Sequence, residues 1–155
     1  MRTAAVAFAL LALAAGCGGG GKATTTTGPP ETAYLTNVEV EGDTVTFEFK
    51  TPPGEVKARY QPRSQVAECG SGAPVRLKGS AYAVVHFIPA ASAEIKGEEV
   101  VPSYTGPKRI SGPGPVLETA KMCDFEADLG WAIGVDRKRP LDVSRDGSTV
   151  TVSFG

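Results

Sequence analysis

Catalytic groups are scarce in this chain of 155 residues. It contains a single histidine, His86, and three cysteines. It lacks the G-x-S-x-G, S-x-x-K and H-E-x-x-H motifs, and it has no glycine-rich loop that ends in Lys-Ser or Lys-Thr. These absences predict a protein without catalytic residues, cofactor or metal ion. A pair of catalytic carboxylates, as in glycosidases, stays open as an alternative. Such a pair is defined by the distance between its two carboxyl groups in space, which the sequence does not show.

Neither sign of charge dominates the sequence. Its 16 Lys and Arg residues face 17 Asp and Glu residues, for a formal net charge of −1. A chain with this balance has no broad electrostatic attraction to nucleic acid. We therefore expect no nucleic-acid partner.

Long hydrophobic runs are also missing. Residues 4–15 form an uncharged apolar run of twelve residues, whereas a membrane-spanning helix needs roughly 20. Because this run follows Arg2 at the start of the chain, it is typical of a secretory signal peptide. It leads into residues 13–17, LAAGC, which resemble the lipobox of bacterial lipoproteins.

The lipobox resemblance implies a lipid anchor at Cys17. In that family the chain is cut before the cysteine and the sulfur is acylated, so residues 1–16 are predicted to be the signal peptide. The acyl chains would hold the protein in the cell envelope, on the outer face of the cytoplasmic membrane. An ordinary signal peptide with an incidental cysteine is the alternative. Residues 17–33 are rich in Gly, Thr and Pro, which predicts a flexible tether.

Residues 34–155 are predicted to form one all-β domain. The whole chain has 19 Gly and 12 Pro, and these residues separate many short apolar runs, which is typical of strands and turns. Apolar and polar residues alternate at 37–50, around Gly42-Asp43, and at 141–154, around Asp146-Gly147. Each alternation predicts a hairpin. About eight strands in total indicate an antiparallel β-sandwich or a flattened barrel. The other expected strands are 56–60, 81–88, 116–122 and 129–135.

Two stretches depart from this strand pattern. Residues 90–95 could form one helical turn. Residues 96–115 are rich in Pro and Gly and are expected to be an exposed excursion rather than core.

Cys69 and Cys123 are predicted to form a disulfide. An exported domain folds in an oxidising compartment, where two remaining cysteines most simply pair. The bond would close a loop of about 55 residues, worth roughly 4 kcal/mol in the chain-entropy account. Two free buried thiols are the alternative. A zinc site is disfavoured, because these cysteines and His86 supply too few ligands.

Several other side chains have both a structural and a functional interpretation. Trp131 could stack on a sugar ring, but it shares strand parity with apolar neighbours, so core packing is favoured. Asp124, Glu126 and Asp128 alternate and could project together to hold Ca²⁺, although calcium sites usually gather more oxygens from a tight loop. His86 is interpreted as a structural or surface residue.

Residues 137–139 form a compact basic turn before Pro140. Arg137 and Arg139 can each offer a planar fork of donors to a carboxylate or phosphate, and Lys138 adds a third charge. This turn could contact anionic polymer or lipid headgroups, but a solvated turn without a ligand is favoured. If the domain binds an envelope polymer, these three residues are the expected contact.

Four segments resemble the AMIN-like domain of actinobacterial lipoproteins, a group related to amidase N-terminal domains. They are residues 42–49 (GDTVTFEF), 70–79 (GSGAPVRLKG), 124–126 (DFE) and 132–143 (AIGVDRKRPLDV). The sequence departs from the family at Leu141, where the family prefers Phe, and in its Cys69/Cys123 pair. The resemblance implies a β-sandwich and a similarity to peptidoglycan-targeting modules. It assigns no catalytic or binding role to any residue.

Two hypotheses of function follow. The first is a lipid-anchored, non-catalytic envelope protein whose partners are the membrane and peptidoglycan, an anionic wall polymer or another envelope protein. The second is an enzyme, or an accessory subunit of one, that acts on cell-wall material. The missing nucleophile and metal motifs favour the first.

Overall fold

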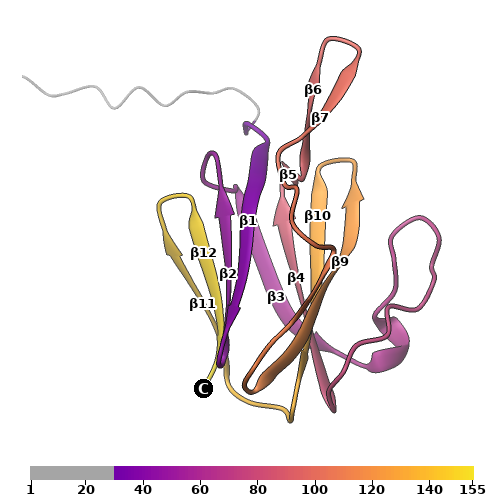
Figure 1. The fold of residues 1–155 in the computed structure, drawn as a ribbon, viewed down its shortest axis with the longest axis vertical. Coiled ribbons are helices and arrows are strands. Elements are labelled where there is room, and N and C mark those ends of the chain that lie inside the picture. The colour runs from indigo at the N-terminus through magenta and orange to yellow at the C-terminus, as the bar shows by residue number, and fades with distance from the viewer. Residues whose placement is uncertain (1–29) are drawn as a thin grey trace, which may run out of the picture.

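The computed structural model describes residues 30–155, which form two five-stranded sheets packed face to face as a β-sandwich (Figure 1). The first sheet has the order β11-β12-β2-β1-β5 and the second has the order β3-β4-β10-β9-β8. Strands β6 and β7 form a separate hairpin, and η1 (Arg63–Gln65) is a short 3₁₀ turn. The strands are β1 (Ala33–Glu41), β2 (Thr44–Phe49), β3 (Glu55–Gln61), β4 (Ala81–Ile88), β5 (Ala90–Ala91), β6 (Ala93–Lys96), β7 (Glu99–Pro102), β8 (Arg109–Ser111), β9 (Val116–Phe125), β10 (Asp128–Val135), β11 (Leu141–Asp146) and β12 (Thr149–Phe154).

The two predicted terminal hairpins are confirmed, and they lie side by side in the first sheet. β1 pairs with β2 and β11 pairs with β12, while β12 joins β2 so that the two chain ends share one sheet. Gly42 and Gly147 occupy the two turns at a φ of +56°, a conformation that side chains with a Cβ rarely adopt. The alternation read from the sequence therefore sets which side chains of this sheet face the core.

Large aromatic side chains fill the space between the sheets. Trp131 on β10 is fully buried, which confirms the prediction that it packs in the core. Its ring lies 5.9 Å from Phe47 and 5.7 Å from Tyr104, and Phe47 lies 4.9 Å from Phe87, centroid to centroid. The two contacts of Trp131 are edge-on and the Phe47–Phe87 contact is tilted, and all three add to the stabilisation from buried apolar area.

The outer face of the second sheet carries a smaller hydrophobic cluster. Residues 62–80 cross this face, and their buried side chains pack on apolar side chains of the strands beneath. Gly134 permits this close approach, because a Cβ there would lie 2.0 Å from the Lys78 carbonyl oxygen. The cluster consists of Val66, Val75, Leu77, Tyr82, Val84, Ala120 and Ala132, with Met122 packed against it.

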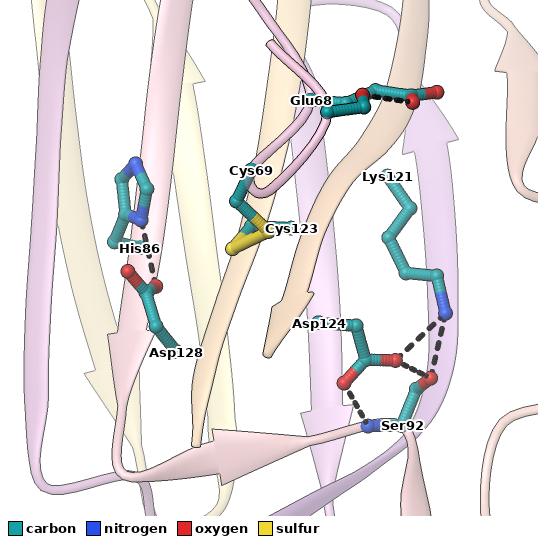
Figure 2. Close-up of a disulfide and its surroundings, with 9 residues drawn as sticks. Glu68, Cys69, His86, Ser92, Lys121, Cys123, Asp124 and Asp128 are labelled. Carbon is teal, nitrogen blue, oxygen red and sulfur yellow. Dashed lines mark hydrogen bonds and ion pairs between the residues drawn. A yellow bond between two sulfur atoms is a disulfide. The ribbon is translucent and has the colours of Figure 1, made fainter. Parts of the chain in front are cut away.

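A disulfide between Cys69 and Cys123 fastens this covering segment to β9 (Figure 2). The two Cα atoms lie 5.1 Å apart, within the normal range for a disulfide. The Cys69 N–H also donates to the Met122 carbonyl oxygen at 3.1 Å. The predicted pairing is confirmed, and the alternatives of free thiols and a zinc site are wrong.

The sandwich is confirmed, but the structure has twelve strands rather than about eight, and it is not a closed barrel. The helical turn expected at residues 90–95 is wrong, because β5 pairs with β1 and β6 pairs with β7. The exposed excursion expected at 96–115 is wrong in part. β8 joins the edge of the second sheet, and Tyr104 is buried against Trp131. No helix in the described part of the chain is long and apolar enough to cross a membrane.

Candidate functional site

The outer face of the first sheet is polar and acidic. Strand pairing aligns its outward residues in three rungs across β1, β2, β12 and β11. The central positions are mostly Ser and Thr, the flanks carry carboxylates, and these rungs include no Lys or Arg. This face therefore repels an anionic polymer. The rungs are Glu41–Thr44–Ser153–Asp142, Glu39–Thr46–Thr151–Ser144 and Asn37–Glu48–Thr149–Asp146.

A groove of about 780 Å³ opens at the end of the sandwich where β3 ends and β4 begins. Its walls are the last residues of β3, the start of η1, the first residues of β4 and the loop after β10. A second hollow, of about 600 Å³, shares Arg63 with it and is also bordered by Ser64 and residues 74–76. The lining residues of the groove are Tyr60, Gln61, Pro62, Arg63, Gly79, Ser80, Ala81, Tyr82 and Lys138.

Two cations of the groove lie over the rings of two tyrosines. The Arg63 guanidinium carbon lies 5.5 Å from the Tyr82 ring centroid, and Lys138 Nζ lies 5.4 Å from that of Tyr60. Cation–π attraction of this kind holds long side chains near one position. Arg63 and Lys138 are therefore kept at the groove, where they lose less conformational freedom on binding a ligand.

The basic turn is divided between structural and surface positions. Arg139 Nε and Nη2 donate to the two carboxylate oxygens of Asp136, each at 2.9 Å. Hydrogen bonds from Arg139 are the main cause that lowers the pKa of Asp136 to about 2. The Tyr60 hydroxyl donates to the Arg139 carbonyl oxygen and accepts from the Arg139 N–H, at 3.0 and 3.1 Å. Arg139 thus fastens the turn, Lys138 reaches the groove, and the Arg137 side chain is exposed beside it.

The groove and the adjoining hollow are lined by positively charged side chains and by no negatively charged ones. Arg63, Arg76 and Lys138 line them, and no lining residue is Asp or Glu. Hydroxyl, amide and aromatic groups complete the surface, including Ser80, Gln61 and the two tyrosines. This combination can bind a ring-bearing molecule with carboxylate or phosphate groups.

Comparison with known families agrees with this fold. The model of the AMIN-like domain matches residues 35–151. The chain belongs to the AMIN-like domain family. No curated protein and no solved structure matches it. Membership places this AMIN-like domain among cell-envelope proteins with a cell-wall-related role.

A Ser–Lys–Asp cluster next to the disulfide is the most enzyme-like arrangement in this AMIN-like domain (Figure 2). Lys121 Nζ lies 2.7 Å from Ser92 Oγ and 2.9 Å from Asp124 Oδ2, and Ser92 Oγ also donates to Asp124. Burial raises the pKa of Asp124, but hydrogen bonds from Lys121 and Ser92 outweigh it and hold that pKa below its usual value. Lys121 Nζ donates to Ser92 Oγ, and the Ser92 hydroxyl donates to Asp124, so the lysine is not placed to accept the proton of that hydroxyl.

Ser92 is also only 6% exposed, so its hydroxyl is closed to a large substrate. The cluster therefore serves as a polar clamp between the segment after β5 and strand β9. It does not have the properties of a nucleophilic site.

The calcium interpretation of Asp124, Glu126 and Asp128 is wrong. Asp124 lies on β9 and is engaged by Lys121, while Asp128 opens β10 and lies 2.7 Å from His86 Nδ1. Glu126 occupies the turn between them at a φ of 49°. Within residues 30–155, no three side chains of the metal-binding types come together.

The sequence predicts only one of the charged residues that line the groove. Lys138 was predicted, whereas Tyr60, Arg63 and Tyr82 were not, because they come from separate elements that only the fold brings together. The one available signal was the Arg63 position just after a Pro, at the end of a strand. Cys17 and its tether lie outside the described residues.

Proposed function

We propose that this AMIN-like domain is a lipid-anchored, non-catalytic module that binds an anionic cell-wall glycan in the groove between Tyr60 and Tyr82. The observation that carries the proposal is the charge of the lining: Arg63, Arg76 and Lys138 meet there without any carboxylate. An anionic polymer gains by contact with this surface and loses by contact with the outer face of the first sheet.

The groove chemistry suits the two parts of such a ligand. Arg63 offers a planar fork of donors to a carboxylate or phosphate, and Lys138 offers a compact charge. The partly exposed Tyr60 ring can contact the apolar face of a sugar ring, whereas Tyr82 is only 7% exposed and lies beneath Arg63. Peptidoglycan carboxylates and the phosphates of other wall polymers share this chemistry, so the experiment below separates the two sources.

The position of the groove fits an anchor at Cys17. β1 begins at the opposite end of the sandwich, where the Ala33 N–H donates to the Pro89 carbonyl oxygen at 3.0 Å. The described part of the chain therefore enters the sandwich at the end away from the groove. Confinement beside the wall also raises the effective concentration, so modest affinity suffices for binding.

A non-catalytic role is supported by the chemistry of the clamp formed by Ser92, Lys121 and Asp124. Lys121 donates a hydrogen bond to Ser92 instead of accepting its proton, and the buried Ser92 hydroxyl cannot contact a polymer. Incubation of the protein with peptidoglycan should release no soluble fragments. Release of fragments by the native chain, but not by Ser92→Ala, would replace this proposal with the enzymatic alternative.

The proposal is tested by sedimentation of the full chain, in mild detergent, with intact wall and with peptidoglycan stripped of other anionic polymers. We expect Arg63→Gln/Lys138→Gln to weaken binding by about fivefold to tenfold, since each exposed charge contact contributes up to about 1 kcal/mol. The matched control is Lys57→Gln/Lys108→Gln, which removes two exposed cations away from the groove and the β6–β7 hairpin. Equal binding by both variants, or no binding by the native chain, would refute the proposal.

A further inference from the structure

The exposed large apolar side chains within residues 30–155 are Ile95, Val100 and Phe125. Ile95 and Val100 are 78% and 69% exposed, and they are direct cross-strand partners on the β6–β7 hairpin. The hairpin projects from the sandwich at the end where β1 begins (Figure 1). An apolar pair on a projecting hairpin adds nothing to the core, which points to an intermolecular contact.

The hairpin has a defined shape and a defined charge. Its four cross-strand pairs run from Ala93 with Pro102 to Lys96 with Glu99. Its base is fixed to the sandwich by the ion pair between Glu94 and Lys50, and this hydrogen-bonded partner lowers the pKa of Glu94. Beyond the apolar pair, the tip presents the exposed carboxylates Glu98 and Glu99, while the exposed Lys96 lies 3.6 Å from the Glu94 carboxylate.

This surface is complementary to the groove at the other end of the same molecule. The hairpin presents an apolar pair followed by two carboxylates, whereas the groove presents the accessible sides of Tyr60 and Pro62 beside Arg63 and Lys138. We propose that the β6–β7 hairpin of one copy docks into the groove of a second copy. Ile95 and Val100 would contact the tyrosine and proline wall, and Glu98 and Glu99 would pair with Lys138 and Arg63.

A second copy fits these features better than a lipid surface does. Insertion of Ile95 and Val100 into a bilayer would first push Glu98 and Glu99 into the headgroups, a costly step at an anionic membrane. A protein groove with uncompensated cations turns the same carboxylates into favourable contacts.

Docking of one end into the opposite end makes the contact heterologous, so it can continue from copy to copy as an open chain. The interface is small and therefore weak in dilute solution. Copies held on one membrane by the anchor of the proposed function would meet at a much higher effective concentration. Wall polymer and hairpin would then compete for one groove, so that wall binding disassembles the chain.

The experiment uses the full chain in mild detergent, prepared as an equal mixture of ¹⁴N- and ¹⁵N-labelled protein and treated with a carbodiimide. This reagent joins a carboxylate directly to an amine in contact with it. We expect mixed-label cross-links between Lys138 and Glu98 or Glu99, and loss of these links when soluble anionic wall polymer is added. The proposal would be overturned if no cross-links form at this pair, or if every cross-link at this pair joins two peptides with the same label.

Substitutions separate self-association from wall binding. Ile95→Ser/Val100→Ser should lower the mixed-label yield about tenfold, equivalent to roughly 1.4 kcal/mol, without weakening sedimentation with wall. Phe125→Ser is the control, because it removes an exposed apolar side chain outside the hairpin and should leave the yield unchanged. Equal yields for the two variants would contradict hairpin docking. If the native chain binds anionic vesicles and Ile95→Ser/Val100→Ser does not, the hairpin would be assigned to lipid instead.

A charge reversal adds a test that misfolding cannot mimic. If Arg63 and Lys138 pair with the hairpin carboxylates, the variant Glu98→Arg/Glu99→Arg should not associate with itself. Mixing it with the variant Arg63→Glu/Lys138→Glu should restore association. Restored co-sedimentation of the two variants supports the proposal, and its absence with both proteins folded would refute it. Failure of the wall assay with success here would leave the groove as a self-association site alone.

Discussion

Arg139 and Lys138 are sequence neighbours with different roles. Arg139 holds Asp136 through two hydrogen bonds and exchanges two backbone hydrogen bonds with Tyr60, whereas Lys138 lies over the Tyr60 ring. Of the two guanidinium groups that the sequence offers to a ligand, that of Arg139 is thus already occupied. Its function is to position the lysine at the groove.

The Asp136–Arg139 pair predicts that the stability of the fold depends on pH in strongly acidic solution. The pKa of Asp136 is lowered from 3.8 to about 2 in the folded chain, so the pair stabilises the fold fully above the unfolded value. That stabilisation is lost as the pH falls from about 4 through about 2. Carbon-detected NMR of the carboxylate should show Asp136 titrating near 2, and Arg139→Gln should return it toward 3.8. A native titration near the ordinary value would contradict the pairing.

Trp131 predicts the largest loss of stability from a single truncation. It is fully buried between Phe47 and Tyr104, so Trp131→Ala should cost about 3–5 kcal/mol in unfolding free energy. Trp131→Phe should cost less, because it keeps a ring and removes an indole N–H without a hydrogen-bond partner among the described residues. Denaturant titration measures both variants. A loss below about 1 kcal/mol for the alanine variant would place the indole outside the core.

At the scale of elements, alternating strands were predictable and short strands were not. The alternation at β2 and β12 is local, so it could be read directly from the sequence. β5 has two residues and exists because it pairs with β1, a partner distant in sequence. Tyr104 belongs to an otherwise exposed segment, but its ring packs against Trp131 in the core. Such tertiary contacts leave no periodic signal in the chain.

The segment at residues 62–80 should depend on its disulfide more than the sandwich does. It contributes few buried side chains, so Cys69→Ser/Cys123→Ser should speed amide exchange near Val66 and Val75. Global stability should fall by up to about 4 kcal/mol, the value expected for a closed loop of this length. Exchange near Val45 and Val152, in the first sheet, serves as the internal control. Uniform loss of protection in both regions would show instead that the covering segment and the sandwich unfold as one unit.

At the scale of the whole molecule, a net charge of −1 conceals a separation of charge. The outer face of the first sheet carries carboxylates, and the groove at one end carries cations. The composition excluded a generally basic protein and could not reveal this separation, because register and loop packing determine where each charge lies. The family resemblance predicted the sandwich, while the groove required the fold.

The anchor is tested independently of the groove. Cys17→Ser removes the sulfur that the predicted lipidation needs, so the variant should leave the membrane fraction or stay unprocessed. Fractionation followed by intact-mass analysis checks both outcomes. A variant that stays membrane-bound at the processed mass would contradict the anchor at Cys17.

The groove is tested most directly by NMR titration of the labelled full chain with a soluble fragment of anionic wall polymer. The account predicts that the largest amide shifts fall on residues 61–63, 79–82 and 138, and that they weaken with added salt because exposed charges are screened. The outer face of the first sheet, around Thr46 and Thr151, should not respond. Shifts centred on that face, or no shifts at saturating polymer, would contradict the assignment of the groove as the binding site.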